Sequence, residues 1–214
     1  MKLFPVIADN WKMDGGVAFG VVPRTIWSRA HEADHNNMIR ITTRCLLIVS
    51  NGRKILIDAG LGDKRNEKYY AVRFREEGVS ILNSLQQLGF TATDITDVLF
   101  THLHDDHVGA ATRLDEKGNP VCVFGNAHYW VSEIHWEWAL KPNRREKAAN
   151  FADNLEPLLQ SGRLHLLKEG EQPFENIILR TYNGHTRGQI IPFIRLKGKT
   201  IVFVADFIPM LTNI

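Results

Sequence analysis

Short runs of apolar residues, each ended by a turn or by polar residues, divide the chain into elements of two kinds. Residues 41–49 (ITTRCLLIV) and 54–58 (KILID) are rich in aliphatic and β-branched side chains, and the Asn51-Gly52 pair between them is typical of a β-hairpin turn. Three similar runs lie near the C-terminal end, IILRTYN, QIIPFIRL and TIVFVAD. These runs, together with strand-like sequence at 121–131, are predicted to be β-strands.

Apolar residues at helical spacing mark the second kind of element. Residues 78–89 (GVSILNSLQQLG) have this spacing and end in a glycine, which favours a helix that stops there. Segments 132–140 (SEIHWEWAL) and 148–162 (AANFADNLEPLLQSG) indicate two more helices, of which the second contains Pro157, a residue expected to break or kink it. Because strands and helices interleave, we predict an α/β sandwich rather than a bundle or an all-β fold.

Composition and charge narrow the class of protein. A chain of 214 residues with 44% hydrophobic residues is predicted to form a single domain, 1–214, with a core that needs no disulfide. The formal net charge of +2 is too small to indicate a nucleic-acid or membrane partner, and Cys45 and Cys122 are predicted to be reduced thiols. No apolar run reaches the roughly 20 residues of a membrane helix, and the N-terminus lacks the apolar region of a signal peptide. We therefore expect a cytoplasmic protein.

One polar stretch, THLHDDHVGA (101–110), has an unusual composition and follows a short apolar run. It contains three histidines and two aspartates in six consecutive positions: His102, His104, Asp105, Asp106 and His107. Such a cluster is costly in a core, because buried ionisable groups need partners. Imidazole suits zinc, iron, cobalt, nickel and copper, and carboxylates extend the range to manganese. We predict that this loop curls around a metal ion, with Asp106 and His107 available to a second ion.

Four segments resemble, in order, the motifs of the metallo-β-lactamase superfamily. HLHDDH matches its His-x-His-x-Asp-His signature, and ILIDAGLG (55–62) resembles the Asp-x-Gly element that precedes it. NGHTRGQ (183–189) resembles its Gly-His-Thr-x-Gly segment, and VFVADF (202–207) resembles the strand that ends in a bridging aspartate. The segments GGVAFGVVPRTIW and YWVSEIHWEWAL look most like the branch of lactonases and organophosphate-hydrolase-like enzymes.

The resemblance implies a fold and a ligand set. The fold would be an αβ/βα four-layer sandwich of two mixed β-sheets with helices on the outer faces. It would hold two divalent metal ions, zinc in the first place and manganese, iron or cobalt as alternatives. The implied ligands are His102, His104 and His185 for the first ion, and Asp106, His107 and the bridging Asp206 for the second. Asp58 would stand behind the ligands and hold the histidine loop through its oxygens.

The sequence departs from the family pattern at several places. Asp105 occupies a position that is commonly apolar or aromatic in this branch, which makes it, with Asp106, a candidate proton acceptor. Arg187 and Gln189 stand where proline and histidine are frequent. The family usually supplies one further histidine to the second ion tens of residues after the bridging aspartate, and this chain ends eight residues after Asp206. We therefore expect a C-terminally incomplete sandwich and a second metal site that is weak or empty.

Other candidates carry weaker predictions. His135 is predicted to pack or cap, and the basic segment 141–147 (KPNRREK) is predicted to be an exposed linker. Three tryptophans either line a pocket for an apolar acyl or aryl group or pack in the core: Trp130, Trp136 and Trp138.

The resemblance implies metal-dependent hydrolysis. A metal-bound hydroxide would attack an ester or lactone-type bond of a small-molecule substrate, with a phosphotriester, thioester or β-lactam as alternatives. Other hypotheses remain: a mononuclear iron oxygenase that acts on a thiol, a truncated non-catalytic metal-binding form, and, disfavoured by the weak net charge, a nuclease. A two-iron oxygen reductase fits less well. A homodimer is left open.

Overall fold

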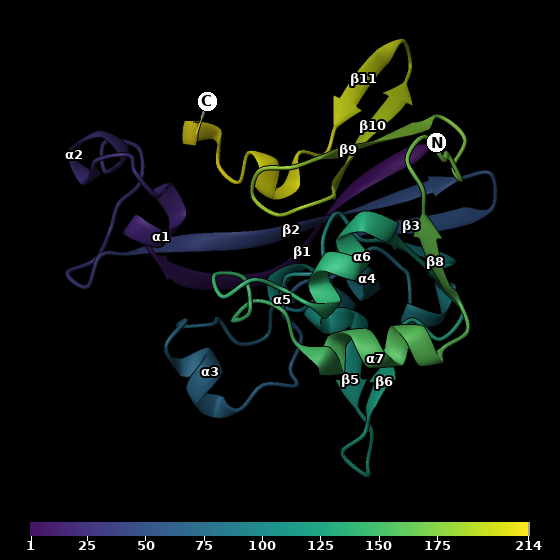
Figure 1. Ribbon diagram of the computed structural model, residues 1–214, viewed down its shortest axis with the longest axis horizontal. Coiled ribbons are helices and arrows are strands. Elements are labelled where there is room, and N and C mark those ends of the chain that lie inside the picture. The colour runs from purple at the N-terminus through teal and green to yellow at the C-terminus, as the bar shows by residue number, and fades with distance from the viewer. Residues whose placement is uncertain (214) are drawn as a thin grey trace.

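A six-stranded mixed sheet is the largest element of the computed structural model, which describes residues 1–213 (Figure 1). In spatial order its strands are β1 (Lys2–Asp14), β2 (Met38–Ser50), β3 (Arg53–Ile57), β4 (Asp97–Leu99), β7 (His128–Ser132) and β8 (Leu164–Leu167). β1, β2 and β3 are antiparallel neighbours, whereas β3, β4, β7 and β8 run parallel. The turn between β2 and β3 has positive φ at Asn51 and Gly52, as a tight hairpin requires, so this predicted turn is confirmed.

A smaller sheet of three antiparallel strands packs on one face of the large sheet. Its strands are β9 (Ile177–Tyr182), β10 (Gln189–Leu196) and β11 (Lys199–Val202), with β10 in the middle. Aliphatic side chains of both sheets form one buried cluster, which includes Ile48 and Ile57 from the large sheet and Ile190 and Ile194 from the small one. The backbone N–H of Ile190 also donates to the carbonyl of Thr101 at 2.8 Å, so β10 is attached directly to the loop that follows β4.

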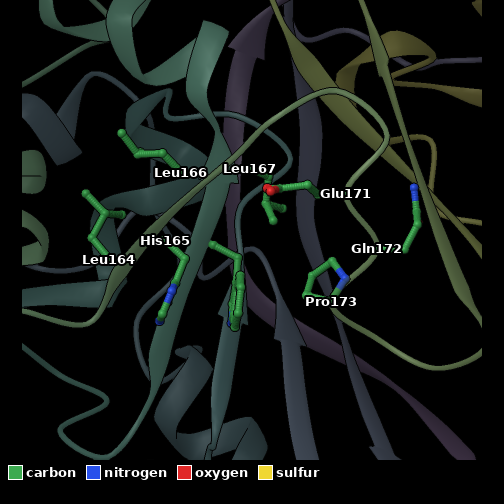
Figure 2. A pocket seen from close by; sticks show the side chains of 8 residues that line it. Leu164, His165, Leu166, Leu167, Glu171, Gln172 and Pro173 are labelled. Carbon is green, nitrogen blue, oxygen red and sulfur yellow. The ribbon is translucent and has the colours of Figure 1, made fainter.

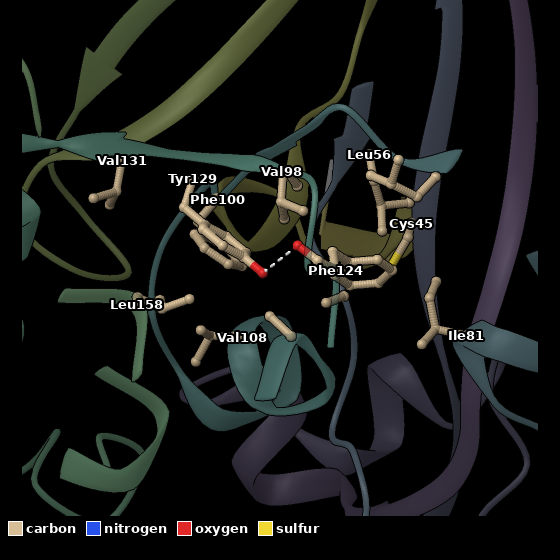
Figure 3. Packing of buried hydrophobic residues seen from close by; sticks show 14 of the residues in the cluster. Cys45, Leu56, Ile81, Val98, Phe100, Val108, Phe124, Tyr129, Val131 and Leu158 are labelled. Atoms are coloured by element: carbon tan, nitrogen blue, oxygen red, sulfur yellow. Dashed lines mark hydrogen bonds between the residues drawn. The ribbon is translucent and has the colours of Figure 1, made fainter. Parts of the chain in front are cut away.

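Helices cover the opposite face of the large sheet. They are α4 (Ile81–Gln87), α5 (Asp105–Val108), α6 (Glu133–Leu140) and α7 (Ala152–Gln160), and they bury a second apolar cluster against the sheet. Figure 3 shows part of this cluster, in which the Tyr129 ring stacks on Phe100 and its hydroxyl donates to the carbonyl of Phe124 at 2.9 Å. The Tyr129 hydroxyl is therefore satisfied although the side chain is fully buried.

The remaining elements are short. They are the helices α1 (Gly15–Phe19), α2 (Arg24–Trp27) and α3 (Glu67–Ala71), the hairpin of β5 (Thr112–Leu114) and β6 (Pro120–Cys122), and the 3₁₀ turns η1 (Ala92–Asp94), η2 (Gly109–Ala111), η3 (Ala205–Phe207) and η4 (Leu211–Asn213). In Figure 1, α1 and α2 lie at the far end of the long β1–β2 arm, and the C-terminal segment returns towards that arm. No helix within residues 1–213 is both long and apolar enough to cross a bilayer.

The α/β fold with two sheets is confirmed, and the structure refines it. The small sheet is entirely antiparallel rather than mixed, because short turns join its strands and leave no room for a crossover helix. Since α4 to α7 pack on one face of the large sheet and the small sheet packs on the other, these elements form three layers. The predicted strand 200–206 ends at Val202, which places Asp206 on η3 instead of on a strand. Helix α7 continues through Pro157 without a break.

Candidate metal centre

The loop after β4 carries the histidine motif. β4 is buried between β3 and β7, and its carboxyl end opens at the edge where loops gather in α/β sheets. His104 precedes α5, which then displays Asp105 to Val108. The ring centroids of His102 and His104 lie 4.6 Å apart, and those of His102 and His107 lie 4.0 Å apart. The three histidines of the motif therefore converge.

His185 and Asp206 join this cluster from the small sheet. His185 Nε2 lies 2.9 Å from His104 Nδ1 and 3.3 Å from Asp206 Oδ2. Asp206 Oδ1 lies 3.3 Å from His107 Nε2, while its Oδ2 lies 4.0 Å from His102 Nε2. Two groups of three ligand atoms, each group within 4.8 Å, result: His102, His104 and His185, and His102, His107 and Asp206. Five of the six predicted ligands are thus brought together.

The sixth predicted ligand, Asp106, lies at the side of the second group. Its Oδ2 is 3.7 Å from His107 Nε2, and its side chain is 27% exposed. Burial raises the pKa of Asp106, and the nearby Asp206 carboxylate raises it further. Because the two carboxylates repel one another, a cation between them would be stabilised.

The first group of nitrogens suits a divalent ion. His102 Nε2 is buried and has no hydrogen-bond partner among the described residues, which is costly unless an ion takes its lone pair. Burial, reinforced by the neighbouring histidines, lowers the pKa of His102, and the same causes lower the pKa of His104 to about 4. Both rings are therefore neutral near pH 7, the state in which imidazole binds a metal. With His185, the group offers three imidazole nitrogens, a donor set that fits zinc and similar ions.

The second group is rich in negative charge. Burial opposes protonation of His107, but the carboxylates of Asp206, Asp106 and Asp58 outweigh it and raise its pKa. Burial also opposes ionisation of Asp206, yet His107 outweighs it and lowers the pKa of Asp206 to about 2. A proton on His107 balances this charge in the described residues, and a divalent ion would do so more fully. The donors present therefore fit two ions.

Asp58 lies behind the ligands, at a left-handed backbone position with φ 58°. Its Oδ1 accepts from the backbone N–H of Thr101 at 2.8 Å. Its Oδ2 accepts from the Thr101 hydroxyl at 2.8 Å and faces His107 Nδ1 at 2.9 Å. With His107 Nδ1 directed at Asp58, Nε2 faces the cluster, where its lone pair would become available to an ion that displaces the Nε2 proton. These are the contacts that the resemblance implies for Asp58.

Glycines allow the segment after Asp58 to approach the histidine loop closely. A Cβ atom on Gly109 would lie 2.1 Å from the carbonyl oxygen of Leu61, which no side chain tolerates. The backbone bonds Ala59 N–H to His107 O (2.7 Å) and Ala110 N–H to Gly60 O (2.8 Å) complete this contact. The two motifs therefore fold as one unit.

Asp105 does not join the cluster. Its carboxylate accepts from the Tyr69 hydroxyl at 2.6 Å, from Asn154 Nδ2 at 2.7 Å and from Arg65, which also binds Asp153. These donors engage both oxygens of a side chain that is 4% exposed. The structure thus gives Asp105 the contacts of a buried structural carboxylate, and only Asp106 of the two expected proton acceptors faces the ligands.

Two residues contact the ligand loops although neither was predicted to belong to the centre: Glu146, and His135, which was predicted only to pack or cap. Segment 141–147 is largely exposed as predicted, but Glu146 turns inward, and its Oε2 lies 3.3 Å from His104 Nε2. His135 is buried; its Nε2 accepts from the N–H of Leu103 at 2.8 Å, and its Nδ1 donates to the carbonyl of Arg187 at 2.7 Å. Burial lowers the pKa of His135 to about 4, consistent with a neutral ring that bridges two loops. In the sequence, Glu146 was notable only as the single acidic residue of the basic segment 141–147.

A cavity of about 430 Å³ opens beside the ligands. It reaches Asp106, His107, His185 and Asp206, and its other walls come from β1, α1, β2 and residues 202–210. The three tryptophans of interest lie elsewhere: Trp130 lines other cavities, Trp136 is buried in the core and Trp138 donates to Glu146. The aromatic side chains that line this cavity are those of Trp11 and Phe203.

A second cavity, of about 590 Å³, contains none of the predicted ligands. Figure 2 shows it along β8, where His165, Leu166 and Leu167 lie opposite the segment from Glu171 to Pro173. It lacks the convergent histidines that a metal site requires. The cavity beside the cluster is therefore the candidate substrate site.

Known proteins share this architecture. The family model of the metallo-beta-lactamase superfamily matches residues 40–214. The structure of a probable metal-dependent hydrolase from Staphylococcus aureus is 32% identical, with a TM-score of 0.86 over 96% of this chain and 72% of that one. The structure of AidC, a dizinc quorum-quenching lactonase, is 24% identical, with a TM-score of 0.75 over 96% of this chain and 71% of that one.

A curated relative is longer. Ribonuclease TTHA0252 from Thermus thermophilus is 26% identical over 169 residues, which are 78% of this chain and 35% of that protein. The chain therefore spans about a third of that relative's length. The motif order, the convergent ligands and the match over residues 40–214 agree, and the chain belongs to the metallo-β-lactamase superfamily.

Proposed function

We propose that this metallo-β-lactamase-fold hydrolase uses two divalent ions, zinc in the first place, to cleave an ester or lactone bond of a small molecule. The observation that carries the proposal is the orientation of Asp206. Its Oδ2 faces His102 and His185, while its Oδ1 faces His107. One carboxylate thus has an oxygen for each ligand group, which is the arrangement of a bridging ligand between adjacent ions.

Two ions held by these residues would supply a nucleophilic water of lowered pKa and a Lewis acid for the attacked carbonyl. The residues of the chain fix where that chemistry occurs. His102, His104 and His185 are the nitrogen donors of the first group, and Asp106 and His107 flank the second. Asp106 also lines the cavity, so it can pass a proton between the reacting atoms and the leaving alkoxide.

The walls of the cavity support a partly apolar substrate. Beside the ligands they consist mainly of hydrophobic side chains: Trp11, Met13, Val17, Ala18, Ile41, Val202, Phe203, Val204, Ile208, Pro209 and Met210. Apolar walls around a few convergent polar groups are typical of small-molecule sites. An acyl chain or an aryl group would bury its surface there while the ester or lactone carbonyl faces the ligands. The solved lactonase of the same fold is consistent with this bond type.

The test combines metal content with a substrate panel. The purified chain is loaded with zinc, its metal content per chain is measured, and its turnover is compared on lactones, aryl esters, a phosphotriester, a thioester, a β-lactam and single-stranded RNA. We expect the highest kcat/KM on an ester or lactone, rising with occupancy of the second ion. One bound iron with thiol-dependent oxygen uptake would instead establish the oxygenase alternative. Turnover of RNA alone would establish a nuclease.

A further inference from the structure

His104 differs from the other two histidines of its loop in the nitrogen that it presents to the cluster. Its Nδ1 faces inward, 2.9 Å from His185 Nε2, so its Nε2 points away from the ligands. His102 and His107 do the reverse: their Nδ1 atoms contact Thr101 and Asp58, and their Nε2 atoms face inward. His104 therefore needs an acceptor at Nε2 that none of the four family-like motifs provides.

Glu146 occupies that place. Its Oε2 lies 3.3 Å from His104 Nε2 and also accepts from the Thr186 hydroxyl at 2.5 Å and from Trp138 Nε1 at 3.0 Å. The Glu146 side chain is 12% exposed. One carboxylate oxygen thus joins three segments: the loop after β4, the loop that carries His185, and α6.

The segment around Glu146 is itself well ordered by hydrogen bonds. Asn143 Oδ1 accepts from the N–H of Glu146 at 2.9 Å, and Asn150 Nδ2 donates to the Glu146 carbonyl at 2.9 Å. The carbonyl of Ala149 accepts from the N–H of Asp105 at 2.8 Å, immediately after His104. These contacts hold the carboxylate in place from both sides, as a positioning group requires.

We propose that Glu146 is a positioning residue that keeps His104 in the tautomer with its proton on Nε2, and so directs the Nδ1 lone pair towards the metal. A carboxylate that accepts from the outer nitrogen of a metal-binding histidine fixes the ring and raises its basicity. Because the same oxygen holds Thr186, which adjoins His185, Glu146 also couples the two histidines that approach the first ion from different sheets. The role concerns metal retention and is independent of which bond is hydrolysed.

The test measures metal binding. In Glu146→Ala we expect the dissociation constant for zinc, measured by competition with a chromophoric chelator, to rise by about 10- to 100-fold. Glu146→Gln keeps a neutral acceptor of the same shape and should give a smaller increase. The absorption spectrum of the cobalt-loaded protein should change in Glu146→Ala, because the orientation of one ligand changes. The matched control is Glu137→Ala, which removes an exposed glutamate of α6 and should leave affinity and spectrum unchanged.

The melting temperature of the metal-free protein separates positioning from a merely structural role. A Glu146→Ala protein that melts earlier but keeps the zinc dissociation constant and the cobalt spectrum would overturn the proposal. If Glu146→Ala does not fold, Glu146→Gln and Thr186→Val decide the question. Thr186→Val leaves the Glu146–His104 contact in place and breaks the link to the loop of His185, so a few-fold loss of zinc affinity is expected. Unchanged affinity in both folded variants would refute the proposed role.

Discussion

The two sheets supply metal ligands of different character. From the large sheet, the side chains of His102, His104 and His107 are 0%, 8% and 9% exposed. From the small sheet, the side chains of His185 and Asp206 are 33% and 24% exposed. In the first set, the ring nitrogens that point away from the cluster contact Thr101, Glu146 and Asp58. The polar side-chain contacts of His185 and Asp206 within residues 1–213 are with other ligands.

This difference shows how the centre is built. The large-sheet ligands are oriented by the fold itself, because their hydrogen-bond partners are buried with them. The small-sheet ligands face the cavity, and their positions depend more on the ion they share. Substitutions on the large-sheet side should therefore affect both metal affinity and stability, whereas those on the small-sheet side should affect metal affinity with little change in stability.

The largest effect is expected when two large-sheet ligands are removed together. In the double variant His102→Ala, His104→Ala the first group retains only His185, too few donors for a stable site. We expect metal content per chain to fall to background and hydrolysis to the rate of buffer, with the far-ultraviolet circular dichroism preserved. Elemental analysis and turnover on the best substrate measure this. A variant that keeps its metal would show that these histidines are not the ligands.

Asp58→Asn should have the next largest effect. Asparagine tolerates the left-handed backbone at this position, so the substitution tests the carboxylate rather than the turn. We expect zinc affinity to fall by about 10- to 100-fold. We also expect the free energy of unfolding to fall by about 1–3 kcal/mol, because buried donors of Thr101 and His107 lose a charged acceptor.

A matched control exists in the same sheet. Asp97 is a buried carboxylate that accepts from Arg53, Trp130 and Thr96, and it makes no contact with the metal ligands. Asp97→Asn should therefore lower stability without changing zinc affinity. Equal losses of zinc affinity in the two variants would mean that Asp58 acts through general stability and not through the histidine loop.

The sequence was most informative where a functional motif or a turn lies directly beside the strand that positions it. The apolar run before His102 was sufficient to place the histidine motif on a loop, and in the structure that loop follows the buried strand β4. Asn51-Gly52 was sufficient for the hairpin, because few residues adopt positive φ at both positions. Convergence of His185 and Asp206 with this loop could be expected only from the resemblance, since nothing local in their segments specifies a partner.

The residues whose places the sequence could not specify depend on orientation and on contacts between loops. Asp105 and Asp106 are adjacent on α5, and successive helical side chains point about 100° apart, so only one of them faces the cavity. Composition could not show which one. Glu146 reaches His104 because the loop after α6 folds back over the motif, a contact between residues that are 42 apart in the sequence. Of the two alternatives for the tryptophans, core packing holds for Trp136, and Trp11 lines the cavity because the β1–β2 arm forms one of its walls.

The smallest expected effect compares one ligand from each sheet in the metal-free protein. His185 lies on a loop and is partly exposed, so His185→Ala should change the free energy of unfolding by less than about 0.5 kcal/mol. His102 is fully buried, and His102→Ala leaves a gap beside Thr101 and His107, which should cost about 1–3 kcal/mol. Both variants should lose zinc from the first group to a similar degree, because each removes one of its three nitrogens. Urea unfolding in the presence of a chelator, with zinc titrations in parallel, measures both quantities. Equal destabilisation by the two variants would contradict the distinction between the two sheets, since it would mean that the exposed ligand is held by the fold as firmly as the buried one.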